Sequence, residues 1–108
     1  MSEVVAKIRQ CYPTADILML GVGDRGQKIG GEVHSLPTIG AMVKAQRECA
    51  QKSGILFWDT RQAMGGDDAI VNWRERQLVN GDYIHLNSAG GKALAKELVP
   101  AIRLLTDN

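Results

Sequence analysis

The sequence has little of what marks a nucleic-acid-binding protein. Of its 108 residues only five are aromatic, and 13 basic against 12 acidic side chains leave a net charge of +1. Neither sign of charge is gathered in a block or a tail. Recognition of nucleic acids needs a basic surface and, for single strands, aromatic rings on which bases stack. We therefore expect no nucleic-acid partner.

Long apolar runs and targeting signals are missing as well. No stretch approaches the roughly 18 apolar residues of a membrane-spanning helix, and the N-terminal MSEVVAKIRQ carries charges within its apolar residues, unlike a signal peptide. We expect no membrane partner and a cytoplasmic chain as written, with a secreted or periplasmic parent protein left open.

Cysteine is scarce too. Cys11 and Cys49 stand alone, without the spacing of metal ligands, at positions where a helix would place apolar residues. This pattern predicts two buried free thiols. We expect neither a metal nor an organic cofactor.

What the sequence does contain is an alternation of helical and strand-like segments. Periodicity predicts helices over residues 4–11, 37–53, 61–64, 68–78 and 88–105, strands over 17–22 and 55–58, and a loop over 23–37. Both strands are unbroken apolar runs, which is typical of a parallel sheet buried on both faces. The pattern predicts a single α/β domain over residues 1–108 with few parallel strands. Two strands leave unpaired edges, so a homodimer through an exposed sheet edge is one expected partnership.

The glycine-rich stretch GVGDRG, residues 21–26, follows the first strand with the spacing of a dinucleotide-binding turn. In such a turn the last glycine opens a helix that receives the pyrophosphate. Here the next predicted helix starts only at Pro37. A sharp turn after the strand is therefore the favoured interpretation, with nucleotide binding as the lesser alternative.

The pattern that carries chemistry lies near the other end of the chain. Asp82 and His85 are three residues apart in a loop that precedes a helix. At this spacing a carboxylate can accept the Nδ1 proton of the imidazole and leave Nε2 free to take a proton. On spacing alone, a histidine tied into its loop by a local hydrogen bond is the favoured interpretation.

The stretch DYIHLNSAG, residues 82–90, resembles the last motif block of the SGNH (GDSL-type) hydrolases. Three further motifs lie earlier in the chain, in the same order as in that family: GVGD at residues 21–24, FWD at 57–59 and MGG at 64–66. The resemblance implies a partial flavodoxin-like α/β/α sandwich, the C-terminal portion of an ester hydrolase. It further implies a carbohydrate acetylesterase or lipase-like activity on a small-molecule or carbohydrate ester.

The same resemblance assigns roles to individual residues. His85 and Asp82 correspond to the catalytic base and the acid that orients it. Gly23, Asp24 and Arg25 lie where the family forms its oxyanion hole and binds substrate. The chain departs from the family in having glycine at position 23, where the family has an oxyanion asparagine, and in lacking the nucleophile block G-D-S.

The serines of the chain do not replace that block. Ser53 precedes a helix-ending glycine, Ser88 is expected to cap the last helix, and Ser35 is next to His34 in the predicted loop. Neighbouring side chains point apart, so we do not expect Ser35 to be a nucleophile. The sequence thus predicts a chain that is inactive alone, with a non-catalytic binding module as the alternative.

Overall fold

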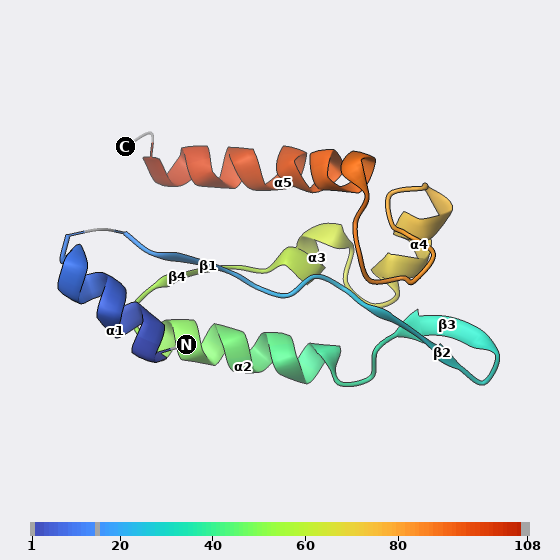
Figure 1. Ribbon diagram of the computed structural model, residues 1–108, viewed down its shortest axis with the longest axis horizontal. Coiled ribbons are helices and arrows are strands. Elements are labelled where there is room, and N and C mark those ends of the chain that lie inside the picture. Colours follow the sequence, from blue (N-terminus) through green and yellow to red (C-terminus); the bar gives the residue numbers. More distant parts are fainter. Residues whose placement is uncertain (1, 15, 107–108) are drawn as a thin grey trace.

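The computed structural model describes residues 2–14 and 16–106 and shows an α/β chain (Figure 1). Its elements are α1 (Ser2–Cys11), β1 (Leu18–Leu20), β2 (Gly26–Ile29), β3 (Glu32–Ser35), α2 (Ile39–Lys52), β4 (Leu56–Trp58), α3 (Thr60–Met64), α4 (Ala69–Glu75) and α5 (Ser88–Thr106). The predicted α/β class is confirmed, and no helix in the described ranges is long and apolar enough to span a membrane.

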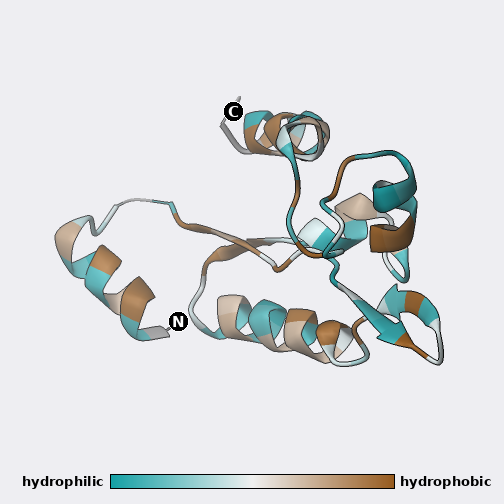
Figure 2. Ribbon diagram, turned by 45° about the vertical axis from the view of Figure 1, so that its right-hand side comes forward, coloured by the Kyte–Doolittle hydropathy of each residue, from teal (hydrophilic) through white to brown (hydrophobic). Residues whose placement is uncertain are grey.

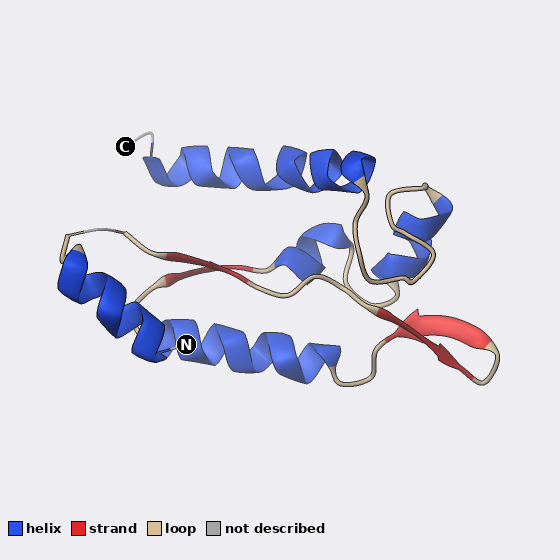
Figure 3. Cartoon of the chain, in the orientation of Figure 1, coloured by secondary structure: helices blue, strands red, loops and turns tan. Residues whose placement is uncertain are grey.

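The two predicted strands form a parallel pair, in which Leu18 lies opposite Leu56 and Leu20 opposite Trp58. Figures 1 and 3 show α2 on one side of this pair and α5 on the other. α2 contributes the buried side chains of Ile39, Val43 and Ala50. The arrangement is that of a three-layer α/β/α sandwich with a narrow central sheet.

The loop predicted over residues 23–37 is wrong in part, because it contains the antiparallel hairpin β2–β3. Gly30 and Gly31 connect the strands with φ angles of +59° and +87°. Two-residue hairpin turns favour positive φ at both positions, which glycine adopts without steric cost. The Gly-Gly pair is therefore a turn signal rather than a sign of irregular structure.

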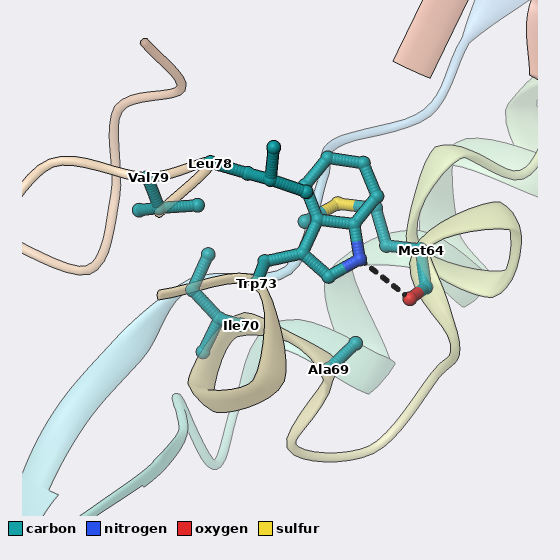
Figure 4. Close-up of a cluster of buried hydrophobic side chains, with 6 residues drawn as sticks. All are labelled: Met64, Ala69, Ile70, Trp73, Leu78 and Val79. Carbon is teal, nitrogen blue, oxygen red and sulfur yellow. Dashed lines mark hydrogen bonds between the residues drawn. The ribbon is translucent and has the colours of Figure 1, made fainter. Parts of the chain in front are cut away.

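The largest buried cluster lies at the α4 end of the molecule. It consists of Met64, Ala69, Ile70, Trp73, Leu78 and Val79 (Figure 4). The indole Nε1–H of Trp73 donates to the carbonyl oxygen of Met64 at 2.9 Å, so this ring is buried with its polar atom satisfied. The cluster joins α3, α4 and the segment that leads to the predicted Asp–His loop.

Two predictions about the ends and faces of helices need correction. Both cysteines are free thiols, as predicted, but neither is buried. Cys11 is exposed, because α1 buries Val5 instead, and Cys49 is half-buried. The last helix is capped by Asn87, whose Oδ1 accepts the backbone N–H of Gly90 at 2.9 Å, while Ser88 is the first helical residue. α3 is capped by Asp59, whose carboxylate accepts the N–H of Gln62 at 2.9 Å.

The segment between α4 and α5 is packed closely against the glycine-rich stretch. The N–H of Gly26 donates to the carbonyl oxygen of Tyr83 at 2.8 Å. A Cβ at position 26 would lie 2.6 Å from the Cβ of Tyr83, closer than real Cβ atoms approach. The final glycine of GVGDRG begins strand β2 and not a helix. Its role is to let the Asp–His loop approach the hairpin, which removes the basis for a dinucleotide-binding turn.

Substitution of Gly26 with alanine tests this contact. We expect Gly26→Ala to lower the free energy of unfolding by about 1–3 kcal/mol, the usual cost of overpacking, because both the hairpin and the loop must shift. Gly40→Ala in α2 is the matched control, since nothing lies within 4 Å of its added methyl group. Urea unfolding followed by circular dichroism measures both. Equal effects of the two substitutions would contradict the close approach.

Candidate functional site

Asp82 and His85 form a short side-chain pair in the loop between α4 and α5. The distance from His85 Nδ1 to Asp82 Oδ2 is 2.6 Å. The other carboxylate oxygen, Oδ1, accepts the backbone N–H of Ile84 at 2.9 Å and that of His85 at 3.1 Å. The carboxylate therefore folds the loop around itself and fixes the ring of His85 at the same time.

The bridge between Val79 and Leu86 closes the base of this loop. Within it, the N–H of Asn80 donates to the carbonyl oxygen of His85 at 2.8 Å. At the start of α5, Gly90 passes so close to Leu78 that a Cβ would lie 2.0 Å from the carbonyl oxygen of Leu78. Gly90 is thus required for the loop to pack against the core.

The geometry sets the tautomer of His85. A carboxylate oxygen at Nδ1 favours the ring with its proton on Nδ1, which leaves Nε2 as a proton acceptor. Within the part of the chain that the structure describes, Nε2 makes no hydrogen bond. The His85 side chain is 73% exposed, so the ring presents its basic nitrogen outward. This is the arrangement of a general base that has an orienting acid.

Hydrogen bonding holds the pKa of Asp82 at about 2, well below its ordinary value of 3.8. The largest cause is the hydrogen bond from the His85 ring, followed by the backbone N–H groups of His85 and Ile84. Since the folded state has the lower pKa, the ionised carboxylate stabilises the loop above about pH 4. That stabilisation is lost as the pH falls towards 2.

The residues predicted for the oxyanion hole follow β1 and have different environments. The N–H of Val22 donates to Oε1 of Gln46 at 2.9 Å, so it is already occupied. The N–H of Gly23 makes no hydrogen bond to any described residue. Gly23 is half-buried, and a Cβ there would lie 3.3 Å from Sδ of Met64. The backbone N–H of Gly23, unlike that of Val22, can therefore donate a hydrogen bond to a bound molecule.

The carboxylate of Asp24, which the sequence predicts to bind substrate, is hydrogen-bonded within the chain itself. Only 2% of the residue is exposed. Its carboxylate accepts hydrogen bonds from Oγ of Ser35 at 2.7 Å, from Nε of Arg61 at 2.9 Å and from the N–H of Ile70 at 2.9 Å. The charge is therefore paired with Arg61, not with its neighbour Arg25. Asp24 joins the hairpin to α3 and α4.

Arg25 and Ser35 both make hydrogen bonds that connect the hairpin to neighbouring segments. Arg25 is exposed, and its carbonyl oxygen accepts the N–H of Leu36 at 2.7 Å. The hydroxyl of Ser35 donates to Asp24 and accepts the N–H of Asp68 at 2.7 Å, so both its hydrogen-bonding functions are engaged. Ser35 is held as a connector in the hairpin.

A second histidine–carboxylate arrangement escaped prediction. Nδ1 of His34 lies 3.2 Å from Asp68 and its Nε2 lies 3.3 Å from Glu32, and both contacts raise the pKa of His34, with the Asp68 hydrogen bond as the largest cause. Both ring nitrogens face acceptors, so this histidine has no free basic nitrogen. The Asp67-Asp68 pair is typical of a helix start, and only the fold brings Asp68 to the hairpin. No group of three or more potential metal ligands gathers anywhere in residues 2–14 and 16–106.

The pKa of Asp82 is open to a direct test. In His85→Ala we expect it to rise from about 2 towards 3.8, but to stop short of it, because two backbone N–H donors remain. His34→Ala is the matched control and should leave Asp82 unchanged. Carboxyl carbon shifts recorded by NMR across pH 1–6 report the value. A pKa of Asp82 that does not move in His85→Ala would show that the two side chains do not interact in solution.

Comparison with known proteins finds similarity in fold to two esterases of known structure. No protein-family profile matches the chain, and no curated protein matches it by sequence. Among solved structures it is similar to a peptidoglycan O-acetylesterase, with 25% identity and a TM-score of 0.85, over 96% of this chain and 30% of that one. It is also similar to the esterase domain of the ORF1 protein of the zebrafish ZfL2-1 retrotransposon, with 15% identity and a TM-score of 0.63, over 94% of this chain and 54% of that one.

The chain thus spans about a third and about half of the two esterases that it matches. The second similarity concerns the fold alone, whereas the first combines a high TM-score with a quarter of the residues identical. Together they confirm the similarity predicted from the sequence: the chain has the α/β fold of part of an SGNH-type hydrolase.

Proposed function

We propose that this chain is the C-terminal portion of a serine ester hydrolase, carrying the acid and base of its active site. The observation that supports this most is the Asp82–His85 pair, which has the short Nδ1 contact of 2.6 Å and an outward Nε2. The attacking hydroxyl comes from a segment outside these 108 residues. Ser35 cannot serve, because its hydroxyl is bound to Asp24 and Asp68.

In this proposal His85 acts twice. Its Nε2 takes the proton of the attacking serine hydroxyl as the oxygen bonds to the ester carbonyl carbon. The resulting imidazolium is stabilised by the Asp82 carboxylate, which stays ionised because its pKa is about 2. His85 then gives that proton to the departing alcohol. Water repeats the sequence on the acyl-enzyme and releases the acid.

The negative charge that develops on the carbonyl oxygen needs a donor. Gly23 supplies its backbone N–H, which is uncommitted within the described chain. The side-chain donor that other members of the SGNH hydrolases place here is absent. Loss of one such donor typically costs about 3 kcal/mol of transition-state stabilisation, so a second donor from the completing segment is part of the proposal.

The substrate class that we propose is an acetylated carbohydrate. The support is the similarity to a peptidoglycan O-acetylesterase, which combines the higher identity with the higher TM-score of the two neighbours. A lipase-like activity on longer acyl groups is the alternative.

Hydrolysis of p-nitrophenyl acetate tests the proposal. The chain alone should not exceed the buffer rate, because a base and an acid without a nucleophile form no acyl-enzyme. Co-expression with the part of the peptidoglycan O-acetylesterase neighbour that this chain does not cover should restore turnover. In that complex His85→Ala should abolish turnover, and Asp82→Asn should lower kcat by up to about 10⁴-fold through loss of the correct tautomer.

His34→Ala is the control, because it removes a histidine that also contacts a carboxylate but has no free basic nitrogen. It should keep most of the restored turnover. Two results would contradict the proposal: steady hydrolysis by the chain alone, or near-normal turnover in His85→Ala. A complex that assembles without turnover would favour the alternative of a non-catalytic binding module.

A further inference from the structure

The chain exposes more surface than a compact protein of its size. A monomer of 11.7 kDa is expected to expose about 5,900 Å², and this chain exposes 7305 Å². Its radius of gyration is 15.6 Å, against about 13 Å for a compact domain of this length. The excess of about 1,400 Å² is larger than the roughly 800 Å² that each partner buries in a standard interface.

The excess includes apolar side chains away from the buried cluster. Half of Leu20 in β1 is exposed, and so are large parts of Val4 and Ile8 in α1, Leu56 in β4, and Val99 and Leu104 in α5. Figure 2 shows apolar residues on α1, β1 and α5, around the parallel strand pair. Exposed apolar side chains of this number near an unpaired strand favour an interaction surface.

One side of β1 also lacks a hydrogen-bonding partner strand in the described sheet, which contains only β1 and β4. The carbonyl oxygen of Ile17 and the N–H of Gly21 both bond to β4. Successive residues of a strand direct these groups to alternate sides, so Leu18 and Leu20 direct theirs to the free side. α1 is anchored close to β4, since Nη2 of Arg9 donates to the carbonyl oxygen of Gly54 at 2.9 Å.

We infer that a second copy of this chain covers the free edge of β1, in a two-fold dimer with a continuous four-stranded sheet. A two-fold axis near Met19 pairs the two β1 strands antiparallel, so that Leu18 exchanges its N–H and C=O bonds with Leu20 of the other copy. Residues 17–22 contain no charge and no proline, the usual devices that block edge pairing. With a net charge of +1 the copies do not repel strongly.

This inference does not depend on the proposed activity, because it needs neither Asp82 nor His85. A segment that completes an esterase domain would compete for the same edge, and the dimer describes the chain in its absence. The apolar side chains of α1 and α5 would enlarge the contact beyond the strand pair. The result is an interface built from the end of the molecule that its own core leaves uncovered.

Light scattering at micromolar concentration, together with amide hydrogen exchange, tests the inference. We expect a mass near twice 11.7 kDa and protection of the Leu18 and Leu20 amides that weakens on dilution. Leu20→Arg should return the mass to that of one chain, because it places a charge on the paired edge. Ile29→Arg is the matched control, since it charges an exposed apolar side chain of the hairpin, outside the strand pair.

A mass of 11.7 kDa for the unaltered chain at all concentrations would overturn the inference. So would a dimer whose Leu18 and Leu20 amides exchange freely, or one that Ile29→Arg disrupts and Leu20→Arg does not. Circular dichroism checks that Leu20→Arg is folded. If it is not, the amide protection of the unaltered chain decides.

Discussion

A buried carboxylate organises this chain. Asp24 lies in the segment 21–25 between β1 and β2, which has no turn, contrary to the sharp turn predicted there. Burial of its charge is tolerable only if every oxygen is bonded. The bonds come from Ser35, Arg61 and Ile70, on three different elements. Removal of one partner from such a buried pair typically costs about 3–5 kcal/mol. The hairpin, α3 and α4 are thereby fixed relative to β1, and the core cluster forms on α4.

The candidate site depends on that arrangement. The loop that bears Asp82 and His85 starts from the core residues Leu78 and Val79 and is bonded to Gly26 through Tyr83. The pair is therefore held on a rigid support, although its own side chains are open to solvent. In the proposed function, this exposed histidine acts on a reactant that the chain itself does not supply. The unpaired edge of β1 and the solvent-exposed Asp82–His85 pair are both parts of the described fold that no other segment of the chain covers.

The sequence predicted the elements whose signals are local. The apolar runs located both parallel strands, and the spacing of Asp82 and His85 allowed the pair that the structure shows. It could not reveal the burial of Asp24, because Arg61 and Ile70 approach only after α3 and α4 pack. The hairpin was missed although its Gly-Gly turn was visible, because its strands have four residues each and are mostly polar. Similarly, Asn87 and Ser88 are both good capping residues, and only the backbone geometry selects between them.

The central claim is that Asp82 fixes the Nδ1-protonated tautomer of neutral His85 and leaves Nε2 as the base. Nitrogen-15 NMR of the imidazole ring tests it most directly, in alkaline solution. The account predicts a shift typical of an unprotonated nitrogen at Nε2 and of an N–H nitrogen at Nδ1. In Asp82→Asn the two tautomers should become mixed. A proton found on Nε2 in the unaltered chain would contradict the account.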